Sequence, residues 1–478
     1  MKTYKINYKI AFIAVLVGGL SSCIPTANLT QNKPAVMPGS YNTSVDSTNS
    51  AKNSWRTFFS DKYLVSLIDT AIKNNPEANI ALQEIIIASN EMKMRKGFLF
   101  PQVNVNGYSA LDKTGRFTSE GAGNASTEME HGKPVPEPLG DFSVGFQTSW
   151  EIDIWHKLHN SKKAAAERYL SSVEGRNFLI TNLVAEIANS YYELLALDNQ
   201  LKIVRESIQL QQRELEIVKV QKEAAIATEL AVKQFEAQLY SAQSMENLIL
   251  QQISETENRI NYLLGRYPQK IERSSESFSD SNPSMVNAGI PSQLLTNRAD
   301  IRQAEHELQA SGLDVKVAKA EFFPALELEG GWGYRAYKPG LLFSTPESMM
   351  YSILGGLTAP FFNRAIIKAE YANANARQMQ TAYAYQNVVL NGYREVANQL
   401  SNINNLEVSY SLKSKQVTTL NQSIDIAHDL FQSAKADYLE VLTAQREALD
   451  AKLEINETMK NRYNAMVNMY KALGGGWF

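Results

Sequence analysis

The chain has very little cysteine: Cys23 is the only one among 478 residues, so no intrachain disulfide can form. It also lacks a basic excess. Its formal charge is −3, whereas a protein that follows nucleic-acid phosphates usually carries a strong basic stripe, so we expect no nucleic acid as partner. Beyond residue 22 there is no run of about 18 uninterrupted apolar residues, which excludes a transmembrane helix. Such a chain can cross a membrane only as a closed β-barrel, because the bilayer core offers no hydrogen-bond partner to an unpaired backbone amide.

Residues 1–22 have the pattern of a secretory signal peptide. Three lysines precede an apolar segment, IAFIAVLVGGL (residues 10–20), which is too short to span a bilayer. The following Leu-Ser-Ser-Cys resembles the bacterial lipobox, in which the cysteine is diacylated and becomes the first residue. We therefore predict that Cys23 is lipidated; the alternative is an ordinary cleavage site with an incidental thiol. Ile24 follows where many inner-membrane lipoproteins carry Asp, which favours the outer membrane.

The rest of the chain is written twice. FLFPQVNVNG (residues 98–107) and EFFPALELEGG (residues 321–331) align when Pro101 is shifted by 223 to Pro324. Later the shift holds at 209, which brings Leu230 onto Leu439 and Gly265 onto Gly474. A constant offset over so long a stretch indicates internal duplication. We expect a lipid-anchored segment over residues 23–60, a first repeat over 61–289 and a second over 290–478.

Each repeat contains two strand patterns. In FSVGFQTSW (residues 142–150), apolar and polar residues alternate, and QVNVNGYSA, LELEGGWGY and YSILGGLTA alternate less regularly. These lengths suit a tilted membrane strand of about 9–11 residues, and long polar connections suit external loops. The alternative is two soluble hairpins. Glu327 and Glu329 share one face of a strand, and we expect them to face the lumen because lipid disfavours charge. A solvated strand end is the other interpretation.

Two long helical patterns account for most of the remaining residues. From Ile180 the apolar positions recur with a mean step close to 3.5, the coiled-coil value, if Gln211 is counted as a polar seam position. A second run begins at Val389. Residues 160–225 contain one glycine and no proline, so we predict uninterrupted rods of about 100 Å. Four strands per chain cannot close a barrel. Two copies would give a plugged eight-stranded barrel and three a twelve-stranded barrel with a lumen, so conduction favours a trimer.

Specific motifs then point to a family. IPSQLLTNRADIRQAEHEL (residues 290–308) and ALGGGW (residues 472–477) are the most specific, and TSWEIDIWHKL (148–158) and LEVLTAQREAL (439–449) fit as well. The sequence resembles the TolC-like outer-membrane efflux factors, in the lipoprotein branch that serves resistance–nodulation–division (RND) pumps. One departure is Ala299, which stands where the family usually has proline.

The resemblance implies a mainly α protein with a membrane β portion. Three chains would form an α-barrel of antiparallel coiled-coil helices and a shared twelve-stranded outer-membrane barrel. The implied function is a passive, trimeric export duct for drugs or other small molecules. Its implied partners are outer-membrane lipid, a periplasmic adaptor and an inner-membrane RND transporter, with no cofactor and no catalysis.

The family also places acidic rings where the returning helices start, at the periplasmic gate. Asp437 and Glu440 are three residues apart and share a helix face, so three chains would gather them around an axis and attract cations. The equivalents in the first repeat are Thr228 and Glu229, with Ala231 at the position that matches Glu440, so one tip is more acidic than the other. Helix capping by Asp437 is the competing interpretation and can coexist with gating.

The helix tips are the implied contact with the adaptor. On this basis we expect Ala225, Ile226, Ala434 and Lys435 to touch it. Ala225 and Ala434 stand where these tips often carry glycine, so the family pattern does not fix the geometry of the turns.

The sequence gives no catalytic or metal motif. His306 begins an H-E-x-x-H pattern that Ala310 breaks, and His156 and His159 have no cysteine or third histidine nearby. We therefore predict no metal site. Alternatives for the function are an outer component for type I secretion or metal efflux, and a structural coiled-coil lipoprotein that does not conduct.

Overall fold

A computed structural model describes residues 37–41, 48–274, 278, 286–359, 364–433 and 435–477. Cys23, with the whole predicted signal peptide, and Ala434 lie outside the described residues. The elements are η1 Ser50–Lys52, α2 Trp55–Phe58, α3 Lys62–Asn74, α4 Pro76–Gly97, β1 Gln102–Asp112, α5 Ser119–Asn124, β2 Glu128–Glu130, β3 Lys133–Pro134, β4 Leu139–Ile152, α6 Lys157–Glu223, α7 Glu229–Leu263, η2 Pro291–Gln293, α8 Leu294–Asn297, α9 Ala299–Ala320, β5 Ala325–Ala336, η3 Pro339–Leu341, β6 Met349–Thr358, α10 Arg364–Gln432 and α11 Tyr438–Ala472.

The chain forms two compact units, and each unit takes segments from both sequence repeats. The described part of the first unit comprises residues 86–170 and 306–382, which include the sheet. The described part of the second lies within residues 33–85, 171–305 and 383–478, which include most of the long helices. None of the helices in the described part of the chain combines the length and apolar character needed to span a bilayer.

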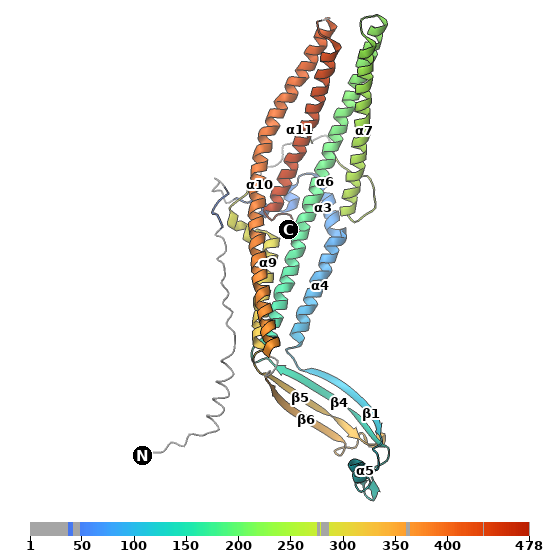
Figure 1. Cartoon of the computed structure of the whole chain (residues 1–478), viewed down its shortest axis with the longest axis vertical. Helices are drawn as coiled ribbons and strands as arrows, with labels where there is room; N and C mark the ends of the chain where they lie inside the picture. Colours follow the sequence, from blue (N-terminus) through green and yellow to red (C-terminus); the bar gives the residue numbers. More distant parts are fainter. Residues whose placement is uncertain are drawn as a thin grey trace, which may run out of the picture. The chain divides into compact units, whose positions relative to one another are not determined.

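The first unit contains a four-stranded antiparallel sheet in the order β1-β4-β5-β6 (Figure 1). β1 and β4 belong to the first repeat and β5 and β6 to the second, so the two hairpins meet where β4 pairs with β5. All four predicted strand segments are confirmed. The inner strands carry the pattern of alternating large apolar and small or polar residues that suits a half-buried strand.

The second unit is built from long helical pairs. α6 contains 67 residues and α10 contains 69, and at about 1.5 Å per residue each rod extends about 100 Å, as the sequence predicts. Most seam residues of α6 from Ile180 to Val218 are buried, with Leu201 partly buried, and several of them pack with α7 around Phe235. Gln211 is 1% exposed, which confirms that a polar side chain occupies the seam.

The seam of α10 is covered less well than the seam of α6. Of its apolar positions, Val396 is fully buried, whereas Leu406, Val417 and Leu420 remain half-buried within the described chain. The same periodicity therefore has a complete partner surface in the first repeat and an incomplete one in the second.

The duplication is visible in matching contacts at the helix ends. Asn75 Nδ2 donates to the carbonyl oxygen of Leu263 at 2.9 Å, and Arg298 Nη1 donates to that of Ala472 at 2.8 Å. Asn75 and Arg298 are related by the early shift, and the two carbonyls by the later one. Asn75 lies between α3 and α4 and contacts the end of α7, and Arg298 lies between α8 and α9 and contacts the end of α11. The repeat therefore extends to three-dimensional packing.

Candidate channel site

The sheet has one apolar face, built from residues that lie opposite one another in register. Val105 pairs with Phe146, Phe146 with Trp332, and Trp332 with Tyr351, so one row crosses all four strands. The rings of Phe146 and Trp332 stack with centroids 6.3 Å apart. Tyr351 is 77% exposed, and the row has no covering element in the described chain. An uncovered aromatic row of this kind is a surface suited to an apolar environment.

The other face of the sheet is polar. Glu327 and Glu329 lie on it, in line with Gln147 and Ser149 of β4 and opposite the aromatic row. Glu327 also lies directly opposite Glu151, an acidic neighbour that the sequence pattern did not single out. This face therefore concentrates negative charge near one end of the sheet.

Both outer strands offer free edges. In the residues that the structure describes, β1 pairs only with β4 and β6 only with β5. Every residue of β6 is exposed, including Ile353 and Leu357. An exposed, apolar edge strand presents a row of unpaired amides and carbonyls and readily pairs with another chain.

The tip between α6 and α7 is a Schellman turn with alanine in the position that normally holds glycine. Ile226 N–H donates to the carbonyl of Gln221 at 2.8 Å, and Ala225 N–H donates to that of Lys222 at 2.9 Å. Ala225 has φ +60°, in the left-handed region that favours glycine. In the tip between α10 and α11, Lys435 N–H makes the corresponding bond to Leu430 at 2.8 Å.

Charge at the first tip is compensated. Thr228 caps α7, because its hydroxyl accepts a hydrogen bond from the N–H of Ala231 at 3.2 Å. Glu229 pairs with Lys222 across the turn and lies 3.8 Å from Lys233 Nζ. The hydrogen bond from Lys222 lowers the pKa of the Glu229 carboxyl. Glu229 is thus ionised, and the two lysines compensate its negative charge.

Charge at the second tip is not compensated in the same way. Asp437 is the N-cap residue of α11, but its side chain makes no capping hydrogen bond. Its carbonyl oxygen instead accepts from Glu440 N–H at 3.1 Å. Both side chains are exposed, and within the described chain neither forms a salt bridge. The capping interpretation therefore does not account for the Asp437 carboxylate.

Two apolar residues at the tips are related by the repeat but were not predicted to be contact residues. Leu230 and Leu439 occupy the same place in the two repeats, in the first turn of the returning helices, and both are exposed. Ile226, predicted to contact the adaptor, is also exposed. The signal in the sequence is the repeat itself, because a leucine retained at one solvent-exposed position in both halves suggests a partner surface.

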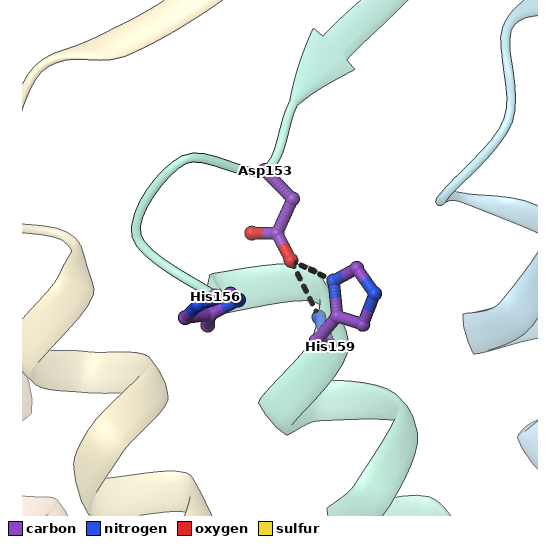
Figure 2. A group of neighbouring side chains, drawn as sticks. All are labelled: Asp153, His156 and His159. Carbon is purple, nitrogen blue, oxygen red and sulfur yellow. Dashed lines mark hydrogen bonds and ion pairs between the residues drawn. The ribbon is translucent and has the colours of Figure 1, made fainter.

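At the junction between β4 and α6, Asp153 caps the helix and holds a histidine (Figure 2). Its carboxylate accepts the backbone N–H of Leu158 at 2.9 Å and that of His159 at 2.8 Å, while His159 Nδ1 lies 2.5 Å from Oδ2. Burial alone would raise the pKa of Asp153, but these hydrogen bonds outweigh it and lower the pKa. His156 lies beside them with φ +56°.

The sheet has one uncovered apolar face and two free edges, and the helices form two long coiled-coil pairs. These features define a class of internally duplicated proteins that combine a sheet suited to a membrane with long helical rods. A family model described as "Outer membrane efflux protein" matches residues 67–266 and 290–475. These segments include most of the chain, and the chain belongs to the outer membrane efflux protein family. The family resemblance predicted from the sequence motifs is confirmed.

Relatives and solved structures agree with this assignment. The chain is 28% identical over 424 residues to the "Cation efflux system protein CusC" of Escherichia coli O6:H1, with 88% of each chain covered. It is 27% identical to the "Pyoverdine export outer membrane protein OpmQ" of Pseudomonas aeruginosa, covering 88% of this chain and 87% of that one. A crystal structure of CusC superposes with a TM-score of 0.82 at 25% identity, over 93% of this chain and 98% of that one.

The chain is therefore an outer-membrane component of an efflux system. This family consists of outer-membrane efflux channels, which are transport ducts. The predicted location and transport role are confirmed. The relatives differ in the cargo their names state, cations in one case and pyoverdine in another, at nearly the same identity.

Proposed function

We propose that three copies of the chain form a passive export duct, and the observation that carries this proposal is the pair of free sheet edges. In the described residues β1 and β6 are unpaired on their outer sides, and an unpaired backbone group in lipid costs several kcal/mol. Pairing β6 of one copy with β1 of the next satisfies these groups. Three copies give twelve strands, enough to leave a lumen.

The two faces of the sheet support this arrangement. The row of Val105, Phe146, Trp332 and Tyr351 would face lipid, where aromatic and aliphatic side chains are stable. The opposite face, with Glu327 and Glu329, would line the duct. A charge turned toward lipid near the midplane costs about 2–4 kcal/mol for a basic residue and less for an acid, so the reverse arrangement is disfavoured.

The half-buried seam of α10 supports contact between copies outside the sheet. Val417 and Leu420 would be covered by a neighbouring chain, which would extend the coiled-coil packing into a trimeric α-barrel. At the tips, Asp437 and Glu440 from three copies would gather six carboxylates around one axis as a cation-attracting gate. Thr228 and Glu229 would add little to it, because Glu229 is neutralised by lysines.

The remaining partners follow from the family. The tips, with Ala225, Ile226, Ala434 and Lys435, would contact a periplasmic adaptor, and an inner-membrane RND transporter would supply the energy. Leu230 and Leu439 extend this surface. A diacylated Cys23 would anchor each chain in outer-membrane lipid. Drugs or other small molecules are the cargo class that such a duct serves.

Disulfide trapping tests the proposed assembly. Asn104, Asn106 or Tyr108 on β1 is replaced by cysteine together with Ser352 on β6, in the full chain in its outer membrane. Three strand spacings of about 4.8 Å separate β1 from β6 within one sheet, so these pairs can form bonds only between copies. We expect non-reducing gels to show dimers and trimers and nothing larger. Single-cysteine variants are the control. Monomers alone, or a ladder beyond the trimer, would overturn the proposal.

Metal export is a second candidate for the cargo, favoured by the names of relatives. Besides CusC, the chain is 26% identical over 96% of its length to the "Probable outer membrane lipoprotein SilC" of Salmonella typhimurium. A strain that lacks its own outer component is grown with and without this chain, either in copper or silver salts or in a hydrophobic dye. The compounds against which the chain restores growth identify the cargo class. Type I secretion would be tested by release of a secreted protein, and a non-conducting spacer would give no single-channel current.

A further inference from the structure

The junction between β4 and α6 brings together three side chains that can bind a metal ion. Asp153, His156 and His159 each offer one ligand atom, and these atoms all lie within 4.8 Å of one another (Figure 2). Residues 153–159 all belong to the first compact unit. Two histidines and one carboxylate form a donor set that suits first-row transition metals and leaves positions open for water.

The carboxylate is held ready to bind a cation. The side chain of Asp153 is 8% exposed, and its carboxylate is fixed by hydrogen bonds from the backbone N–H groups of Leu158 and His159. The two histidines are exposed, so an ion can reach them from solvent. One oxygen, Oδ2, already lies 2.5 Å from His159 Nδ1, and a metal ion can take the place of the hydrogen bond between these atoms.

The surrounding structure fixes the junction and does not oppose a cation. Trp155 Nε1 donates to the carbonyl of Pro324 at 2.8 Å, and its ring stacks on Phe323 with centroids 4.6 Å apart. The nearest lysine in the sequence, Lys157, is paired with Glu151 at 2.5 Å and with Glu321 at 3.7 Å. Its positive charge is therefore compensated away from the histidines.

We propose that Asp153, His156 and His159 bind one divalent transition-metal ion per chain, with Cu²⁺ bound most tightly. Cu²⁺ exceeds Zn²⁺ and Ni²⁺ in affinity for nitrogen and oxygen donors. Binding requires the Asp153–His159 contact to widen by about 0.5 Å and the His156 ring to turn, so that each nitrogen reaches about 2.0–2.1 Å from the ion. Both rings are on the surface and have room to move.

The test uses Cu²⁺ and the full-length chain purified in detergent. We expect calorimetry to show one saturable site per chain, and electron paramagnetic resonance to show coupling to two imidazole nitrogens. His156→Gly removes one ligand without straining the backbone, because glycine readily adopts φ +56°. Since removing an outer-shell partner alone costs about 10–100-fold in metal affinity, losing this ligand should weaken binding at least tenfold.

Matched controls separate the site from other copper ligands. His131→Ala changes a histidine in a loop of the same unit and should leave affinity and spectrum unchanged. His156→Gly should keep or raise the melting temperature while its spectrum loses one nitrogen. The proposal is overturned if the wild-type chain shows no saturable binding, if His156→Gly binds as tightly as wild type, or if His131→Ala weakens binding equally.

Discussion

Replacing Ala225 by glycine and Gly265 by alanine should shift local stability in opposite directions. Both residues occupy the same position of a Schellman turn, the first at the end of α6 and the second at the end of α7. Ala225 has φ +60° and Gly265 has φ +66°. In the second turn the N–H of Arg266 donates to the carbonyl of Asn261 at 3.0 Å, the counterpart of the Ile226 bond.

The expected magnitudes follow from conformation and from space. A residue with a side chain costs about 1–2 kcal/mol in the left-handed region, and glycine loses about 0.4–1 kcal/mol more than alanine through the entropy of the unfolded chain. Ala225→Gly should therefore stabilise the tip by about 0.5–1 kcal/mol. Gly265→Ala adds a collision, because a Cβ would lie 2.6 Å from the carbonyl oxygen of Asn74. Its expected cost is about 2–4 kcal/mol.

Hydrogen exchange measured by mass spectrometry reads both turns in one experiment. Peptides covering residues 218–232 should exchange about 2–5 times more slowly in Ala225→Gly, since about 1.4 kcal/mol corresponds to a factor of ten. Peptides covering 258–270 should exchange at least about 30 times faster in Gly265→Ala. Gly474→Ala is the matched variant in the second repeat, where a Cβ would lie 2.6 Å from the carbonyl oxygen of Asn297. Faster exchange in Ala225→Gly, or wild-type exchange in Gly265→Ala, would refute this reasoning.

Three further predictions concern charge. Combined Asp437→Ala and Glu440→Ala substitutions should increase ion leak through the purified channel in planar bilayers, because they remove uncompensated carboxylates. Unchanged conductance and an unchanged frequency of the closed state would show that these residues do not form a gate. Phe146→Arg should reduce heat-modifiable assembly on gels, because an arginine on the apolar face costs about 2–4 kcal/mol in lipid. Gln147→Arg on the polar face should assemble normally. Equal behaviour of the two variants would contradict the assignment of the faces. Arg298→Met should cost about 1–3 kcal/mol in thermal unfolding, because it leaves the partly buried carboxylates of Asp300 and Glu395 without the buried guanidinium that pairs with them. A melting temperature equal to wild type would show that these ion pairs contribute no net stability.

Much of the fold could be predicted because it rests on periodic patterns. Alternation in residues 142–150 fixed the faces of β4, and the 3.5-residue step identified α6 and α10 as long rods. The offset of 209 relates Leu230 to Leu439 from the sequence alone. These features follow from local spacing and from repetition, both of which are properties of the sequence itself.

The remaining features depend on where turns bring side chains. Glu229 reads as an acid at a helix start, but its partner Lys222 lies on the other side of a turn whose path depends on Ala225 being left-handed. Asp153 joins His159 for a similar reason, since the chain reverses through His156 at positive φ. A non-glycine residue in that region is uncommon, so the sequence predicts an ordinary turn there.

The two repeats show which contacts duplication preserves. The carbonyls of Leu263 and Ala472 are both bound, although the donors are an amide in Asn75 and a guanidinium in Arg298. A carbonyl left free at a buried helix end costs free energy in either repeat, so the bond persists while the side chain that makes it changes. The exposed Asp437 carboxylate satisfies no such requirement. Charge at the tips could therefore diverge between the repeats. Three chains have six tips in total, and the exposed carboxylates would lie at the three tips between α10 and α11.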